Sequence, residues 1–235
     1  SQFTSLVEQG YTRIPLTRRV MADLDTPVSA YAKLAVGNYS YLFESMHGGE
    51  KWGRYSIIGL PCSTLIKVFG DEVSVYQHGQ CIERLHCDDP LAFIEQYQQR
   101  FIVPSIEGLP TFFGGLVGYF GYDTVRYVEP RLKASVPPDQ LHTPDILLML
   151  SDDVLVFDNV AGQLHLITHC DVSNYVEALG NAAESRFSDE LLKSLRADYE
   201  LCMTKLDSIE QRLQQSSPNL PKLSVEVDET VTGLQ

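Results

Sequence analysis

The sequence predicts an α+β protein with mainly antiparallel sheets and flanking helices. Three observations support this fold class. Short segments rich in β-branched and aromatic residues fill much of the first two thirds of the 235-residue chain. Turn-forming residues separate these segments, and connections this short favour antiparallel pairing. The last third instead carries apolar residues at the spacing of an α-helix.

The first expected helix precedes the first group of strands. Thr26 and Pro27 stand directly before the segment VSAYAKLA, and proline is favoured at the first position of a helix. Gly37 and Asn38 then mark the end of this helix. The local sequence therefore predicts one short helix between residues 27 and 36.

Five short strands are expected after this helix. Each is rich in β-branched or aromatic residues, and turn-forming pairs such as Gly48-Gly49 and Gly70-Asp71 separate them. The expected strands are residues 39–45, 54–60, 63–69, 72–77 and 81–86.

A second helix follows, because Asp88-Asp89-Pro90 is a typical start for a helix over residues 91–101. A strand is expected over residues 112–120, where three glycines suit a bulge or a close backbone approach.

Three further strands are expected between residues 145 and 168. They are joined at 151–153 and 158–162, and such short connections imply antiparallel pairing. The first joint holds Asp152 and Asp153, which we interpret as solvated turn residues.

Residues 173–215 have a helical pattern, and its second half carries one apolar stripe. Two interpretations remain open: the stripe packs on the protein's own sheet, which we favour, or it contacts another subunit. The pattern predicts a domain over residues 1–215 and a linker over 216–235, which is rich in Ser and Pro and then polar. The stripe consists of Leu192, Leu195, Tyr199, Cys202, Leu206, Ile209 and Leu213.

Composition narrows the possible functions. The chain is 44% hydrophobic and 21% charged, as is usual for a globular protein, and its net charge of −13 argues against nucleic-acid or anionic-membrane partners. No apolar run approaches the roughly 20 residues of a membrane span, and the start of the chain lacks the pattern of a secretion signal. Five irregularly spaced cysteines favour reduced thiols and a cytoplasmic location.

The sequence shows no convincing catalytic or metal motif. Neither G-x-S-x-G nor H-E-x-x-H occurs. The segment HGQCIERLHC holds two His and two Cys, so a zinc site is an alternative to a hairpin with incidental thiols, but the paired C-x-x-C spacing is missing.

One short segment, SYLFESMHGGEKWGRYS, combines residue types suited to binding a free amino acid. If its two ends form adjacent strands, Glu44, Ser45, Trp52, Arg54 and Tyr55 come together at one end. The carboxylate could hold an ammonium group, the arginine a carboxylate and the aromatic rings a side chain. The alternative is a surface Glu–Arg pair on a hairpin, which contributes little.

Five segments follow one another along the chain: TPVSAYAKL, SYLFES, GGEKWGRYSIIGLPC, GGLVGYFGYDTVRYVEPRL and TPDILLMLSDDVLVFDN. These motifs, in this order, resemble the N-terminal half of anthranilate synthase component I, a member of the chorismate-utilising enzymes. The resemblance runs from about Tyr11 to Val160. The large subunit of aminodeoxychorismate synthase is a related enzyme whose motifs match less closely.

The resemblance implies a feedback site for L-tryptophan. The family's L-L-E-S element falls on residues 42–45, with Phe43 in place of Leu. A residue at this position of a strand points away from the face of Leu42 and Glu44, so we expect it to alter packing rather than recognition. The implied tryptophan-binding residues are Glu44, Ser45, Trp52, Gly53, Arg54 and Tyr55.

The resemblance also accounts for the missing catalytic motifs. In this family chorismate, magnesium and the catalytic groups belong to the C-terminal half, so no catalytic or metal-binding residue is assigned here and the chain alone is expected to be inactive. The intact enzyme would form anthranilate and pyruvate from chorismate and ammonia. A glutaminase subunit, component II, would supply the ammonia within a hetero-oligomer. The competing hypothesis is a non-catalytic amino-acid sensor or interaction module.

Overall fold

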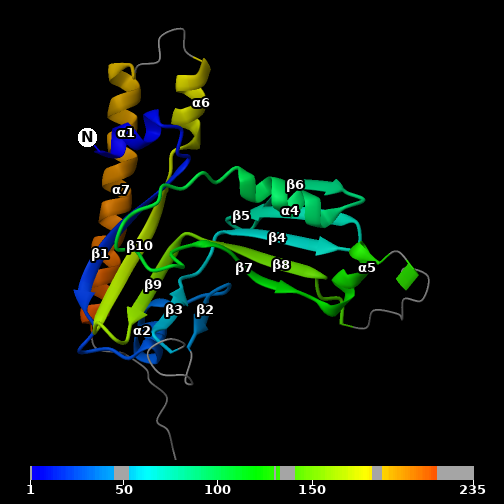
Figure 1. Cartoon of the computed structure of the whole chain (residues 1–235), viewed down its shortest axis with the longest axis horizontal. Helices are drawn as coiled ribbons and strands as arrows, with labels where there is room; N and C mark the ends of the chain where they lie inside the picture. Colours follow the sequence, from blue (N-terminus) through cyan, green and yellow to red (C-terminus); the bar gives the residue numbers. More distant parts are fainter. Residues whose placement is uncertain (1, 45–52, 130, 133–140, 182–186, 216–235) are drawn as a thin grey trace, which may run out of the picture.

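Two five-stranded antiparallel sheets form the protein, and helices flank them (Figure 1). The computed structural model describes residues 2–44, 53–129, 131–132, 141–181 and 187–215. This architecture confirms the predicted α+β class with antiparallel sheets. None of the helices in these residues is both long and apolar enough to cross a membrane.

The first sheet has the strand order β1-β10-β9-β3-β2, and the second has the order β6-β5-β4-β8-β7. The strands of the first sheet are β1 (Arg13–Met21), β10 (Gln163–Asp171), β9 (Asp153–Asp158), β3 (Tyr55–Gly59) and β2 (Tyr41–Phe43). Those of the second are β6 (Gln80–His86), β5 (Glu72–Gln77), β4 (Thr64–Phe69), β8 (Ile146–Ser151) and β7 (Gly115–Phe120).

Local capping fixes the two helices that the sequence predicted best. Thr26 Oγ1 accepts a hydrogen bond from the Ser29 amide, and Ser29 Oγ accepts one from the Thr26 amide, so α2 begins with a capping box. Asp89 caps α4 by accepting from two backbone amides. The helices are α1 (Gln2–Glu8), α2 (Pro27–Leu34), α4 (Pro90–Gln99), α5 (Val125–Val128), α6 (Ser173–Asn181) and α7 (Asp189–Gln214), with a 3₁₀ turn at Tyr122–Thr124.

The short joint at residues 151–153 does not form a hairpin, so the expected pairing of its two flanking strands is wrong. β8 pairs with β4 and β7 in the second sheet, whereas β9 pairs with β3 and β10 in the first. The chain therefore passes from one sheet to the other at this joint, and it does so again between β3 and β4. A bend that carries the chain from one sheet to another needs as few residues as a hairpin, so length alone could not separate the two cases.

Asp152 and Asp153 are not the solvated turn residues that the sequence suggested. Asp152 forms an ion pair with the buried Arg13 of β1. Asp153 lies 2.6 Å from Lys205 Nζ and accepts a hydrogen bond from Thr168 Oγ1. Both carboxylates therefore connect elements of the fold. Asp152 contacts β1, and Asp153 connects the start of β9 to β10 and α7.

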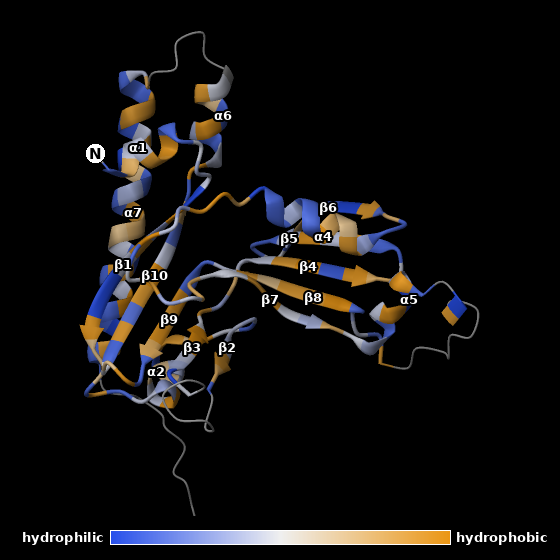
Figure 2. Ribbon diagram, in the orientation of Figure 1, coloured by the Kyte–Doolittle hydropathy of each residue, from blue (hydrophilic) through white to orange (hydrophobic). Residues whose placement is uncertain are grey.

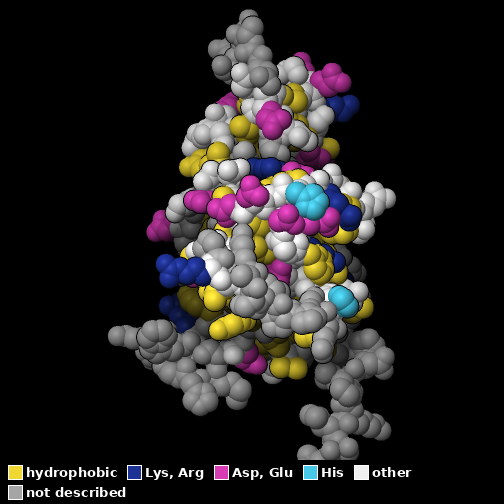
Figure 3. Space-filling model, turned by 90° about the vertical axis from the view of Figure 1, so that its right-hand side faces the viewer, with side chains coloured by type: hydrophobic (Ala, Val, Ile, Leu, Met, Phe, Trp, Pro, Cys, Tyr) yellow, Lys and Arg dark blue, Asp and Glu magenta, His cyan; other side chains and the backbone are white. Residues whose placement is uncertain are grey.

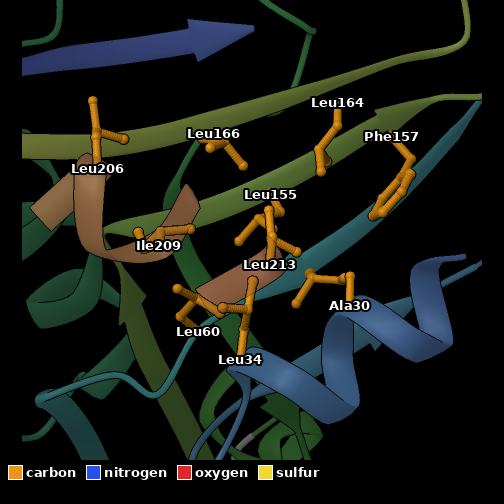
Figure 4. Close-up of a cluster of buried hydrophobic side chains, with 11 residues drawn as sticks. Ala30, Leu34, Leu60, Leu155, Phe157, Leu164, Leu166, Leu206, Ile209 and Leu213 are labelled. Carbon is orange, nitrogen blue, oxygen red and sulfur yellow. The ribbon is translucent and has the colours of Figure 1, made fainter. Parts of the chain in front are cut away.

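Helix α7 supplies much of the core through the predicted stripe. Figure 4 shows Leu206, Ile209 and Leu213 gathered with side chains of the first sheet, such as Leu155 and Leu166. This packing confirms the interpretation that the stripe covers the protein's own sheet. The expected helical segment 173–215 is divided into α6 and α7, and Ser188 caps the start of α7.

The hydropathy of the strands depends on their position in each sheet. The inner strands of both sheets are coloured as hydrophobic in Figure 2, whereas β6 at the edge of the second sheet is more polar. Figure 3 views the end of the molecule that carries α5, where hydrophobic and acidic side chains lie side by side. Exposed apolar residues near this end include Phe120, Tyr122 and Val128.

Candidate functional site

The candidate site lies at one end of the β2–β3 strand pair. The two strands pair antiparallel, with Tyr41 opposite Gly59 and Phe43 opposite Ile57. This pairing confirms that the two ends of the motif are adjacent strands. Glu44 directly follows β2 and Arg54 directly precedes β3, so both lie at the same end. Ser45 and Trp52 lie outside the described residues.

Tyr41 anchors β2 to the joint between the sheets. Its ring lies across Gly59, where an added Cβ would come within 1.9 Å of Tyr41 Cε1. Its hydroxyl shares a hydrogen bond of 2.7 Å with Ser151 Oγ, and burial raises the pKa of Tyr41 to about 12. The phenol therefore stays protonated and holds the strand at a fixed position.

Phe43 occupies the face expected from strand alternation. Leu42 packs toward the core beneath α2 and α7, whereas the Phe43 ring lies 4.8 Å from the ring of Tyr41 and is 52% exposed. The Phe43 ring thus adds an accessible apolar surface beside the site, on the face opposite Leu42.

Arg54 binds a carboxylate that the sequence did not identify. Its Nη2 lies 2.6 Å from Asp158 Oδ2, and its Nε lies 3.1 Å from both Asp158 oxygens. Asp158 is only 4% exposed, whereas the Arg54 side chain is 45% exposed. The hydrogen bond from Arg54 lowers the pKa of Asp158. The guanidinium also lies 5.0 Å over the ring of Tyr55.

The turn after β9 holds the whole segment 53–56 in place. Asn159 Nδ2 donates to the Gly53 carbonyl and to Ser56 Oγ, and the Asn159 amide donates 2.8 Å to the Arg54 carbonyl. The sequence identified residues 158–162 only as a turn. Nothing in the spacing connects Asp158 and Asn159 to a hairpin about one hundred residues earlier, so these supporting residues could not be predicted.

His165 is a second residue that the sequence did not single out. It lies on one row of the first sheet with Arg19, Val156, Ile57 and Phe43, because these residues are paired across neighbouring strands. Leu164 and Leu166 face α7, so this row faces away from that helix.

The His165 imidazole is 5% exposed, and its Nδ1 lacks a hydrogen-bond partner within the described part of the chain. Burial, and then the charge of Arg19, lowers the pKa of His165, whereas Asp158 opposes this shift. A buried nitrogen without a partner costs about 1–3 kcal/mol.

A pocket in the described part of the chain lies elsewhere. It has a volume of about 750 Å³ and is formed by α1, β1 and the first half of α7, with Phe3, Ile14 and Tyr199 among its lining residues. Figure 1 shows α1 and β2 at opposite ends of the first sheet. Glu44, Gly53, Arg54 and Tyr55, the described residues that the sequence selected for amino-acid binding, are not among those that line this pocket. The hairpin therefore remains the better candidate on residue chemistry.

Comparison with known proteins gives a consistent set of relatives. Anthranilate synthase component 1 from Pseudomonas aeruginosa is 53% identical over 195 residues, which are 83% of this chain and 39% of that protein. The Neisseria meningitidis serogroup B protein of the same name is 51% identical over 73% of this chain and 35% of its own length. The protein of that name from Aquifex aeolicus is 36% identical over 80% of this chain.

This chain spans less than two fifths of the length of these relatives. No family model matches it. A solved structure of anthranilate synthase component I from Streptococcus pneumoniae covers 86% of the chain at 24% identity, with a TM-score of 0.45.

Proposed function

Because this chain is a homologue of anthranilate synthase component 1 over most of its length, we propose that it is the feedback-regulatory part of such an enzyme and binds L-tryptophan at the β2–β3 hairpin. The observation that carries this proposal is the 53% identity to the Pseudomonas aeruginosa protein over 83% of the chain. The residue chemistry at the hairpin supports the choice of an amino-acid ligand.

In this proposal each group of the hairpin has one task. The Ser45 hydroxyl hydrogen-bonds the ligand, Glu44 attracts the α-ammonium group, and Trp52 and Tyr55 form apolar walls around the indole. Gly53 leaves space for the ligand next to the strand. Because Asp158 already occupies Nε and Nη2 of Arg54, Nη1 is the donor that we assign to the α-carboxylate.

Asp158 and Asn159 act as positioning residues in this arrangement. They hold the backbone of residues 53–56 and the guanidinium of Arg54 before any ligand arrives. Groups fixed in this way lose less conformational freedom on binding, and that preorganisation favours affinity.

The reaction itself is assigned to the rest of the enzyme. The intact enzyme would convert chorismate and ammonia to anthranilate and pyruvate, with ammonia supplied from glutamine by the component II subunit of a cytoplasmic hetero-oligomer. Across the described residues no three His, Cys, Asp or Glu side chains come close enough to hold a metal ion. We assign the magnesium of the intact enzyme to the rest of that protein. We assign residues 1–215 to the regulatory domain and 216–235 to the linker toward the catalytic part.

Two alternatives follow from the same observations. The chain could be part of the large subunit of an aminodeoxychorismate synthase, or a non-catalytic amino-acid sensor. The names of the relatives favour anthranilate synthase over the first alternative. The coding sequence after residue 235 distinguishes the sensor from our proposal, because a sensor would lack a chorismate-binding domain there.

Calorimetric titration of the protein with L-tryptophan tests the binding proposal directly. We expect one site that prefers L-tryptophan to D-tryptophan. The Ser45→Phe variant should bind at least tenfold more weakly, because an unpaired polar group costs about 1–3 kcal/mol before any steric clash. Equal affinities of the parent protein and the variant would place the ligand elsewhere.

A further inference from the structure

Strand β7 forms an edge of the second sheet that lacks the usual protection against further pairing. Within the described residues it pairs only with β8, and the register of the two strands is continuous. Its six residues, GLVGYF, include no charge and no proline. Edge strands of soluble proteins normally carry a charge, a proline or a bulge, or are very short, because an open edge readily accepts another strand.

The other edge strands in the described part of the chain all have such features. β1 has three arginines and Pro15, and β2 is only three residues long. β6 has Glu83 and Arg84, and its register with β5 shifts beside Tyr76. The open character of β7 is therefore not a general property of these two sheets.

The register of β7 shows which of its backbone groups point outward. Directly after the strand, the Gly121 amide donates a hydrogen bond of 2.7 Å to the Asp145 carbonyl. Bonded and non-bonded pairs alternate along an antiparallel ladder, so Leu116, Gly118 and Phe120 direct their N–H and C=O groups away from β8. No other strand, turn or loop among the described residues bonds to these outward groups.

Apolar side chains continue this open edge. Phe120 is 53% exposed, and Tyr122 in the turn that follows is 93% exposed. Val125 and Val128 of α5 are exposed as well, and Figure 1 shows α5 at the same end of the second sheet as the tip of β7. An exposed apolar patch of this kind marks an interaction site in soluble proteins.

We propose that the edge of β7 is an interaction surface at which a strand from the rest of the enzyme adds to the second sheet. The row of outward backbone groups carries this inference, because an added strand satisfies such a row. Its apolar side chains would cover Phe120 and Tyr122. The inference rests on the proposed function in one respect, namely that this chain is part of a longer enzyme.

Two observations favour the rest of the same enzyme as the partner. The matched region is 39% of the Pseudomonas aeruginosa relative, so about three fifths of such an enzyme lies outside this chain. A segment of the same polypeptide is present at a high effective concentration. A second copy of this chain would instead bring together two net charges of −13, and their repulsion opposes association.

Hydrogen exchange in the intact enzyme, purified without component II, tests whether the edge is paired. The amides of Leu116, Gly118 and Phe120 should exchange about 100-fold or more slowly than amides of an unstructured peptide, because they donate to the added strand. Exchange of all three at the rate of unstructured amides would overturn the proposal.

A photo-cross-linker identifies the partner. We expect benzoylphenylalanine in place of Phe120 to cross-link, within one enzyme molecule, to a peptide from outside residues 1–235. The matched control is the same probe at Ile82 on the edge of β6, which is 58% exposed and should give no such product. Should the probe at residue 120 prevent folding, the exposed position of Tyr122 replaces it.

The other outcomes of cross-linking would contradict the proposal. A product within residues 1–235, with a second copy, or only with added component II would give the edge a different partner. A yield no higher than that of the Ile82 control would mean that nothing adds to the edge.

Titration of the same intact enzyme with L-tryptophan separates this inference from the proposed feedback site. A protected β7 edge in an enzyme that does not bind tryptophan would refute only the hairpin site. An unprotected edge in an enzyme that binds tryptophan would refute only the added strand.

Discussion

At the scale of single residues, the ion pair between Arg54 and Asp158 fixes the start of β3. The carboxylate is nearly buried and also accepts hydrogen bonds from the amides of Val160 and Ala161. A carboxylate with this many donors is stabilised in its charged form. It therefore connects the stability of the hairpin to pH.

Replacing Asp158 with Asn should lower Tm at neutral pH but not in acid. The pKa of Asp158 is lowered in the folded protein, so its ionised form adds stability at pH values above the unfolded pKa of about 4. That contribution is lost as the pH falls through the lower, folded pKa. Thermal unfolding between pH 3 and 7 should show the difference between parent and Asp158→Asn shrinking toward acid pH.

The control for this experiment is Asp71→Asn, because the Asp71 side chain is 72% exposed. The difference in Tm between the parent protein and Asp71→Asn should not shrink toward acid pH. A difference between the parent protein and Asp158→Asn that stays constant from pH 3 to 7 would contradict the role given to the charge.

Gly59 should not tolerate a side chain. An alanine Cβ would lie 1.9 Å from the ring of Tyr41, and the ring cannot move without losing its bond to Ser151. Gly59→Ala should therefore lower the free energy of unfolding by about 1–3 kcal/mol in urea titrations. Gly180→Ala, where nothing lies within 4 Å of the new Cβ, should be neutral or slightly stabilising. Equal effects of the two changes would disprove the steric argument.

The residues of the candidate site were only partly predictable. The alternation of β2 and β3 placed Glu44 and Arg54 at one end of a strand pair, and the structure confirms that placement. The partner of Arg54 was not predictable, because Asp158 reaches it through the pairing of β3 with β9. His165 gave no signal at all, since its burial depends on the three-dimensional packing of the sheet.

At the scale of elements, α7 determines whether the first sheet has a core. Leu206 is fully buried between α7 and the first sheet, and Ile209 and Leu213 continue the contact toward α2. Most helical stability in proteins comes from such packing rather than from intrinsic propensity. A charge placed within this contact should therefore unfold the domain.

Leu206→Asp should abolish the cooperative unfolding transition, because it buries an unpaired carboxylate in the core. Circular dichroism and thermal melts measure this loss directly. Leu201→Asp on the same helix is the matched control, since Leu201 is 69% exposed, and it should fold normally. A folded Leu206→Asp protein with a smaller oligomeric state would instead mean that the stripe is a subunit contact.

The sequence predicted elements better than it predicted their connections. Strong β propensity and clear turns located β3, β4 and β5 to within a residue or two. β1 was not predicted, because its three arginines and one proline obscure the alternation of apolar and polar residues that is typical of a strand. In the structure β1 pairs with β10. The joint at residues 151–153 was misinterpreted because a bend between sheets and a hairpin turn use similar residues.

At the scale of the whole molecule, the chain corresponds to less than two fifths of the relatives that it matches. In our proposal, regulation belongs to this chain and the chemistry belongs to the rest of the enzyme. The fold described here then serves to present the hairpin from a rigid sheet, supported by the turn after β9.

The purified chain by itself should not form anthranilate. Supplied with chorismate and magnesium, it should give no anthranilate fluorescence with either glutamine and component II or ammonia as the nitrogen source. The reason for this expectation is that the chain spans less than two fifths of the length of its relatives, and our proposal assigns the catalytic groups to the rest of the enzyme. Turnover above that of a heat-denatured sample would contradict this division of roles.

The central claim, that the hairpin is the tryptophan feedback site, is tested most directly by inhibition curves of the intact enzyme. In Ser45→Phe the tryptophan concentration for half inhibition should rise at least tenfold, while turnover without tryptophan stays within about twofold of the parent. Ser194→Phe, at an exposed position of α7, should leave both quantities unchanged. Unaltered tryptophan sensitivity of Ser45→Phe, or an equal loss of uninhibited turnover, would contradict the claim.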